Sequence, residues 1–439
     1  MTACGLDFGT SNTTLGVARG DGPVLCALEG GESTLPSAIF FDREGARRLG
    51  RAAIDAYVEG VEGRLMSGLK SVLGSSLIDE KTQIGARRVA FRHVIGAYMQ
   101  GVKEQAEGCL GHELTSVVHG RPVHFVDGDA AADRRAEDAL RVIAHEIGFR
   151  DVCFQFEPIA AALDYEQHID AEQVALIADI GGGTSDFSIV RLSPDRRRRV
   201  ERGEDILAND GVHIGGTDFD RVLALRSVTP LLGHNSPMKR ADLNVPSSYF
   251  HDIATWHRIN RLYDPKVLTE VRQVRRDAAR PELIDRLIRA IEERRGHALV
   301  GAVEKAKIRL ASNPRTRLAL DWMGPDVAVD ISAEDLAERT GALASRISGR
   351  IASCLALAGL RAGDIDALFL TGGSTRLAHV RRAIIGELPH ARVIEGDTFG
   401  SVGIGLSIEA GRRFGPAGGR AAAPATRGDG RLPGTARSR

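Results

Sequence analysis

The stretch ALIADIGGGTSDFSIV, residues 175–190, decides how the fold is interpreted. It places Asp179 and then a run of three glycines between two apolar segments. The start of the chain, GLDFGTSNTTLGVA, places Asp7, a glycine and small hydroxyl side chains in the same order. Apolar runs on both sides of such turn residues predict a β-hairpin with the loop at its tip. Two hairpins of one pattern predict a chain with two halves built on one plan.

The bulk composition is that of a globular protein with no net charge. The 439 residues are enough for two or three compact units. Because 58 basic residues balance 58 acidic ones, we expect no attraction to nucleic acid or to an anionic membrane. No leader and no apolar run of roughly 20 residues is visible. The five cysteines are scattered and form no CxxC pair, which argues against a disulfide framework or a zinc site. We therefore expect a cytoplasmic location.

Strands and helices alternate along the chain, which predicts an α/β fold. A helical region around 80–110 precedes a strand at 116–123 and an alanine-rich helix at 132–149. A short apolar strand then leads through Glu157-Pro158 into another alanine-rich helix, and Pro158 suits the first helical position.

The second half of the chain contains a long charged segment. It is helical from about 219 to 312, with polar, proline-containing interruptions. A strand, a glycine turn and a helix follow at 364–385, and a short strand and a small-residue helix at 392–411. From about 415 the glycine- and arginine-rich tail has almost nothing to bury, so we expect it to be disordered.

The glycine-rich loops suggest a site for phosphate. Consecutive backbone N–H groups can surround an anion where no Cβ blocks the approach, and hydroxyl groups add further donors. Asp7 and Asp179 would repel a bare phosphate, so a cation must lie between them. Mg²⁺ takes one or two carboxylates together with phosphate oxygens, which predicts a nucleoside triphosphate with magnesium. For either loop alone, a simple hairpin turn remains the alternative. No GxxxxGK[ST] motif is present, which excludes a P-loop.

Two further patterns have both an ordinary and a functional explanation. Lys70, in RLMSGLKSVLG, is either a solvated surface lysine or a cation of the phosphate site. Glu304 and Lys307 lie three residues apart on one helix, a spacing that usually means an exposed ion pair.

Seven motifs in one order resemble the nucleotide-binding domain of the DnaK-type (seventy-kilodalton heat-shock) chaperones. These motifs are DFGTSNTTLGVA, EPIAAALDY, IADIGGGTSDFSIV, HIGGTDFD, VEKAKIRLAS, LFLTGGSTRLAHV and GDTFGSVGIGL. The resemblance covers roughly residues 3–412 and implies an actin-like ATPase domain: two lobes of duplicated ribonuclease-H-like fold with a nucleotide between them. It implies lobe I at 1–168, lobe II at 169–383 with an enlarged helical insertion at about 219–312, a return to lobe I at 384–414, and a disordered tail at 415–439.

The resemblance also implies roles for individual residues. Lys70 would position the attacking water, Glu157 and Asp179 would help to hold it, and Asp7 and Asp179 would orient Mg²⁺ through its waters. The phosphates of ATP or ADP would lie against Gly9, Thr10, Ser11, Asn12, Gly181, Gly182, Gly183, Thr184, Gly215 and Gly216. The adenosine would lie against Glu304, Lys307, Gly372, Gly373, Ser374, Arg376 and Asp397.

The chain departs from the family pattern in several places. Thr217 replaces an acid, Ile308 an arginine at the adenosine helix, Ala311 a serine and Ala378 a proline. Because only the glycine-, alanine- and arginine-rich tail follows the nucleotide-binding region, we expect no hydrophobic linker or β-rich peptide-binding domain, a pattern that resembles the YegD-type bacterial proteins.

Three functions are compatible with these motifs. The first is an ATP-hydrolysing, chaperone-like switch that acts on protein clients or through co-chaperones. The second is a small-molecule, sugar-type kinase on the same fold, and the third is an actin-like filament ATPase. ATP turnover without an acceptor distinguishes the first from the second, and polymer formation identifies the third.

Overall fold

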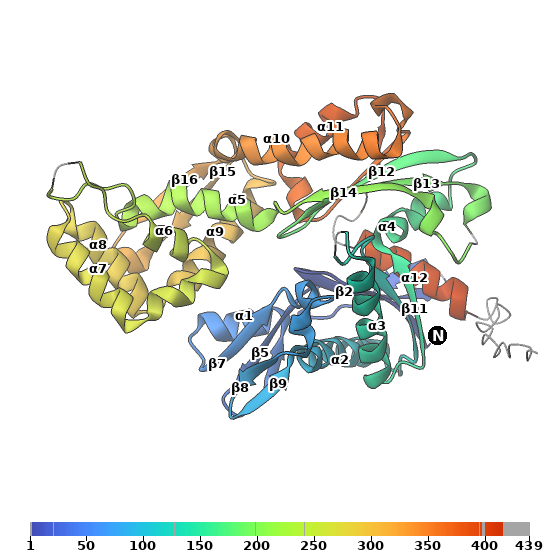
Figure 1. Cartoon of the computed structure of the whole chain (residues 1–439), viewed down its shortest axis with the longest axis horizontal. Coiled ribbons are helices and arrows are strands. Elements are labelled where there is room, and N and C mark those ends of the chain that lie inside the picture. Colours follow the sequence, from blue (N-terminus) through green and yellow to red (C-terminus); the bar gives the residue numbers. More distant parts are fainter. Residues whose placement is uncertain are drawn as a thin grey trace, which may run out of the picture.

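Two β-sheets in two lobes organise the chain (Figure 1). The computed structural model describes residues 2–20, 22–126, 128–197, 199–240, 242–394, 396 and 400–415. The first sheet has the order β11 (Asp151–Phe156), β10 (Ser116–Arg121), β1 (Ala3–Phe8), β2 (Asn12–Arg19) and β3 (Gly22–Leu25), with β4 (Leu35–Pro36) paired to β2. The second has the order β14 (Ile206–Val212), β13 (Ser185–Leu192), β12 (Gln173–Ile180), β17 (Ala367–Thr371) and β18 (Arg392–Ile394).

The two sheets share one topology and one register. In the first, β1 pairs antiparallel with β2 and parallel with β10. In the second, β12 pairs antiparallel with β13 and parallel with β17. Asp7 lies opposite Thr14 and Asp179 lies opposite Asp186, which is the same offset in both hairpins. The predicted α/β class and the predicted duplication are therefore confirmed.

Helices cover the outer face of the first sheet. α2 (Phe91–Leu110) and α3 (Ala130–Glu146) pack there, and Val94, Tyr98 and Ile143 join the strand residues in one core. The apolar spacing along both helices explains this, since one face of each helix is buried.

Two small-residue helices lie between the sheets, α4 (Glu157–Glu166) and α12 (Ser401–Phe414) (Figure 1). α12 packs on the first sheet, where Gly5 leaves room for Leu406. The opposite helix, α4, packs on the second sheet through residues such as Ile159. Gly405 lies so close to Ala160 that a Cβ would overlap its carbonyl oxygen. The glycine thus permits the close approach of the two helices on which the lobes meet.

The outer part of lobe I is a small sheet with one helix. β5 (Ala38–Asp42), β6 (Arg47–Leu49) and β7 (Gly63–Ser67) form the order β6-β5-β7, and α1 (Gly50–Val58) packs on it.

The outer part of lobe II contains the predicted helical segment. Its elements are α5 (Gly216–Leu223), α6 (Ser248–Ile253), a 3-10 helix (Trp256–Tyr263), α7 (Pro265–Asp277), α8 (Pro281–Glu292) and α9 (Gly296–Leu310). The hairpin β15 (Arg315–Ala319) and β16 (Ala328–Ser332), then α10 (Ala333–Ala358) and α11 (Ala378–Glu387), complete the lobe. Phe250, Ile253 and Val271 of the segment are buried in the main core of this lobe, so the segment is part of the fold.

Two boundaries expected from the sequence were wrong. The helical region placed at 80–110 begins with the hairpin β8 (Lys81–Ile84) and β9 (Arg87–Ala90), because alternating residues point inward and Gly85 turns the chain at φ +52°. The return to lobe I placed at 384 comes later, because β18 still pairs with β17 in the second sheet. The expected tail at 415–439 lies outside the described residues, apart from Gly415.

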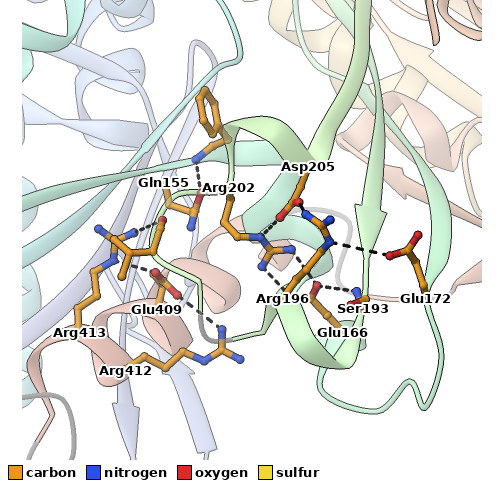
Figure 2. A network of polar contacts seen from close by, with 12 residues as sticks. Gln155, Glu166, Glu172, Ser193, Arg196, Arg202, Asp205, Glu409, Arg412 and Arg413 are labelled. Atoms are coloured by element: carbon orange, nitrogen blue, oxygen red, sulfur yellow. Dashed lines mark hydrogen bonds and ion pairs between the residues drawn. The ribbon is translucent and has the colours of Figure 1, made fainter. Parts of the chain in front are cut away.

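An ion-pair network ties the end of α4 to the connection between β13 and β14 (Figure 2). Arg202 is buried and donates to both carboxylate oxygens of Glu166, at 2.8 and 3.0 Å. It also pairs with Asp205, which accepts from Arg196 as well. Two arginines thus balance two acids, and the pairing offsets the cost of burying them.

No helix in the described ranges is both long and apolar enough to cross a membrane.

Candidate functional site

The two glycine loops have the same local geometry. The backbone N–H of Gly9 donates to the carbonyl of Asn12 at 3.0 Å, and that of Gly181 donates to the carbonyl of Thr184 at 2.9 Å. Each loop is therefore a tight turn closed by one hydrogen bond, two residues after an aspartate. The hairpin-turn interpretation is correct for both loops, but it does not explain why they lie together.

The two loops meet between the lobes. A Cβ at Gly182 would collide with the side chain of Ser11, which places the two loop tips against each other. Thr10 and Ser11 are exposed, and nothing lies within 4 Å of the position that a Cβ would take at Gly183. The exposed Thr10 and Ser11 and the open space beside Gly183 thus leave room for an anion at the loops, as a phosphate site requires.

A third glycine turn packs on the second loop. The N–H of Gly216 donates to the carbonyl of Gly181 at 2.9 Å, and the N–H of Thr217 donates to that of Gly182 at 2.8 Å. A Cβ at Gly215 would lie 2.6 Å from the Gly182 carbonyl carbon. The predicted residues of lobe II are therefore one compact surface at the N-terminus of α5, where the helix dipole favours an anion.

Four charged side chains gather at the base of these loops. The Nζ of Lys70 lies 2.5 Å from Oε1 of Glu157, and the two side chains are 10% and 18% exposed. Asp7 and Asp179 are the next-to-last residues of β1 and β12, and both interact electrostatically with this pair. The surface-lysine alternative for Lys70 is therefore wrong.

Burial and the excess of acids over the lysine raise the pKa values of two of these acids. Burial raises the pKa of Asp7 to about 8, with Glu157 and Asp179 adding to the rise and Lys70 opposing it. Burial, Asp186 and Glu157 raise the pKa of Asp179 to about 6. Burial opposes the charge on Lys70, but the carboxylates outweigh it and hold the pKa of this lysine above its ordinary value.

These residues fit the predicted magnesium. No group of three or more His, Cys, Asp or Glu side chains among the described residues could hold a metal by itself. Two carboxylates, Asp7 and Asp179, fit a cation that keeps its waters and takes its other ligands from phosphate. Burial and the neighbouring acids raise their pKa values, and such a cation would offset this by favouring the charged carboxylates.

Of the residues predicted for adenosine, some contact the glycine loops and one points to solvent. Lys307 is buried and donates to the Gly216 carbonyl at 3.0 Å and to Asp220 at 2.8 Å, and the hydroxyl of Ser374 lies 3.4 Å from the Gly181 carbonyl. The Glu304–Lys307 ion pair considered from the sequence is not formed, because Lys307 points toward the glycine loops. Glu304 is exposed.

A cavity of about 280 Å³ lies beside this surface. It is lined by Ala311, Leu370, Thr375, Arg376, Arg381, Ile394 and Gly396. Ile308, in the last turn of α9, is 56% exposed. Gly373 begins the turn that carries Arg376, and Gly372 has φ +78°, where a Cβ would lie 2.7 Å from Oδ1 of Asp179. Asp397 lies outside the described residues.

Sequence reasoning missed Asp220 and Asp186. Asp220 is the ion-pair partner of Lys307, and burial raises its pKa to about 6 against the lowering effect of the lysine. Asp186 faces Asp179 across the hairpin. Asp186 lies in the motif IADIGGGTSDFSIV and Asp220 in HIGGTDFD. The expected strand register could have identified Asp186 as the neighbour of Asp179.

Comparisons with known proteins identify the family of this chain. A profile of the Hsp70 protein family matches residues 3–229 and 284–409. The chain therefore belongs to the Hsp70 family. It is similar to the chaperone protein HscA homolog of Azoarcus sp. (strain BH72), with 27% identity over 428 residues that cover 93% of this chain. The aligned region covers 57% of that relative. Residues 230–283, in the enlarged part of lobe II, lie between the two matched regions.

Proposed function

We propose that this chain binds ATP with Mg²⁺ between its lobes, hydrolyses it, and uses the nucleotide state as a two-lobe switch in a chaperone-like activity. The observation that carries this proposal is the pair of equivalent loops, Gly9–Asn12 and Gly181–Thr184, facing each other above one cluster of charged side chains. Family membership and the similarity to a curated chaperone support it.

The proposed roles follow from where each group lies. The N–H groups of Gly9 and Gly181 close the two turns, so the hydroxyls and the other N–H groups of both loops would donate to phosphate oxygens from opposite sides. Asp7 and Asp179 would hold the cation, and Mg²⁺ when bound neutralises charge on the phosphates. Glu157 fixes Lys70 by the 2.5 Å contact, so that the ammonium can orient a water in line with the terminal phosphoryl group.

The partners and location that we propose are those of a chaperone. Protein clients or co-chaperones would respond to the relative position of the lobes. All five cysteines are free, which suits a reducing compartment such as the cytoplasm.

The test is ATP turnover by the purified full chain with Mg²⁺ and no acceptor. We expect phosphate release that chelation of the metal abolishes and that Asp179→Asn reduces at least a hundredfold. Asp364→Asn is the matched control, since Asp364 pairs with the largely exposed Arg361 at the surface and its loss should leave turnover unchanged. Turnover only in the presence of a sugar would contradict the proposal in favour of a kinase, and ATP-dependent light scattering would favour a filament.

A further inference from the structure

The segment that the family profile does not match reaches across to the other lobe. Residues 230–283 belong to the outer part of lobe II, and α1 belongs to the outer part of lobe I. The hydroxyl of Tyr57 on α1 donates to Oδ1 of Asn260 in this segment at 2.9 Å. The two residues are 203 positions apart in the chain.

A row of rings accompanies this hydrogen bond. The ring of Tyr57 meets His297 edge to face with centroids 4.7 Å apart, and Trp256 meets the same histidine at 4.7 Å. His297 is 4% exposed and is the second residue of α9, whereas Trp256 belongs to the unmatched segment. Edge-to-face contacts of this kind add stabilisation beyond the apolar area that they bury. The rings therefore join α1 of lobe I, α9 and the segment in one cluster.

The segment is anchored firmly on the lobe II side. The N–H of Gly296 donates to the hydroxyl of Tyr263 at 3.2 Å, and a Cβ at Gly296 would lie 3.0 Å from that oxygen. Ile259 and Leu262 of the same 3-10 helix are buried. A contact made on such a fixed element cannot simply follow lobe I when the lobes separate.

The same helix connects the contact to the nucleotide site. α9 begins at the ring cluster and carries Lys307, which bonds Gly216 and Asp220 beside the phosphate loops. His297 and Lys307 are about 15 Å apart along the helix axis at 1.5 Å per residue. Separation of the lobes must therefore break the Tyr57 contacts as well as the contacts to a bound nucleotide.

We propose that residues 230–283 form a strap, through Trp256 and Asn260, that holds the outer ends of the two lobes together and slows the release of bound nucleotide. This inference rests on the proposed nucleotide function. The strap contacts α1 of the same chain. Loss of the strap contact would speed the separation of the lobes and would leave the hydrolysis of bound ATP unchanged.

The main experiment measures the dissociation of a fluorescent ADP analogue by stopped flow. Tyr57→Phe removes only the hydrogen bond and should speed release about threefold, and Asn260→Ala should do the same. Tyr57→Ala also removes the ring contact and should speed release at least tenfold. Because Tyr57→Phe and Asn260→Ala break the same bond, the double variant should release no faster than either single one.

The matched control is Tyr249→Phe. Tyr249 lies on α6 in the same segment, beside Glu270 of α7, and touches no part of lobe I in the contacts described above. Its release rate should equal that of the wild type. Unchanged release in the Tyr57 variants, or an equal acceleration in Tyr249→Phe, would overturn the strap.

A readout without nucleotide separates this inference from the proposed function. The chain has two tryptophans, so Trp322→Phe leaves Trp256 as the reporter in the strap. In that background Tyr57→Ala should at least double the acrylamide quenching constant of Trp256. If the wild type bound no nucleotide, the proposed function would fail while this measurement still tested the contact. Equal quenching with and without Tyr57 would refute the contact itself, even if nucleotide binding were intact.

Discussion

Replacing Lys70 with alanine tests the centre of the proposed site. The Lys70 ammonium lies 2.5 Å from Glu157, and both side chains are largely buried, so solvent screens the pair weakly. Loss of one preorganised charged group from such a site typically costs about a hundredfold to a thousandfold in rate, or about 3 to 4 kcal/mol. We expect Lys70→Ala to lower single-turnover hydrolysis by that factor. Nucleotide affinity should change by less than about fivefold, because the loops proposed to hold the phosphates remain.

The same substitution should shift the pH dependence of the residual activity. Lys70 lowers the pKa values of Asp7 and Asp179, so its removal raises both. The carboxyl groups then need a higher pH to ionise, and the acid limb of the rate profile moves upward. A loss of lysine packing alone would lower the rate without moving this limb.

A second lysine of lobe I provides the control. Lys103 pairs with Glu107 at 2.6 Å, and its side chain is 9% exposed, which matches the burial of Lys70. Lys103→Ala should cost stability but leave hydrolysis within about twofold of the wild type. The assay is quench-flow with labelled ATP and excess protein, together with calorimetric titration of a non-hydrolysable analogue. Hydrolysis by Lys70→Ala within threefold of the wild type, or an equal loss in Lys103→Ala, would refute the assignment.

Three further predictions concern stability and the base site. Arg202→Met leaves Glu166 without its buried partner and should lower the free energy of unfolding, measured in urea, by about 3 to 5 kcal/mol. Arg361→Met, at an exposed ion pair, should lower it by less than about 1 kcal/mol, and similar losses in the two variants would contradict the reasoning. Burial lowers the pKa of His119 to about 4, so the unfolded chain takes up the proton first as pH drops, and stability should fall between about pH 6.5 and about pH 4. The thermal stability of His119→Leu should depend less on pH in that window, and an unchanged slope would contradict this role of His119. Ile308→Arg, at an exposed position of α9, should tighten ATP binding about threefold to tenfold by cation–π contact with the base, and calorimetry showing no change would count against that site.

The hairpins and their loops could be predicted because their signals are local. Apolar runs on both sides of Asp7 and of Asp179 determine antiparallel pairs, and the glycines determine the turns between them. The equal offset in the two hairpins follows from the equal spacing of the motifs. Residues 81–90 show the limit of this reasoning, since four-residue strands with a glycine between them do not stand out from a neighbouring helix.

Pairings between distant residues could not be predicted in this way. Lys307 and Asp220 are 87 positions apart, and nothing in either motif indicates that they bond. The Lys70–Glu157 pair spans the same distance in sequence, and only the family resemblance suggested that both residues serve one site. The contact of Tyr57 with Asn260 involves a segment for which the family offers no pattern, so the structure alone reveals it.

The balance of charge distinguishes the candidate site from the other buried ionic cluster. In the network of Figure 2, Arg196 and Arg202 face Glu166 and Asp205, so the buried charges cancel and need no ligand. At the base of the glycine loops, one lysine faces three acids, and two of those acids have raised pKa values. The folded protein therefore retains protons that the unfolded chain has lost, and without a cation these two carboxyl groups destabilise the fold increasingly as pH rises from about 4 through about 8. An ion-pair network with a purely structural role would gain nothing from this loss of stability, whereas binding of a cation and phosphate at the site would offset it.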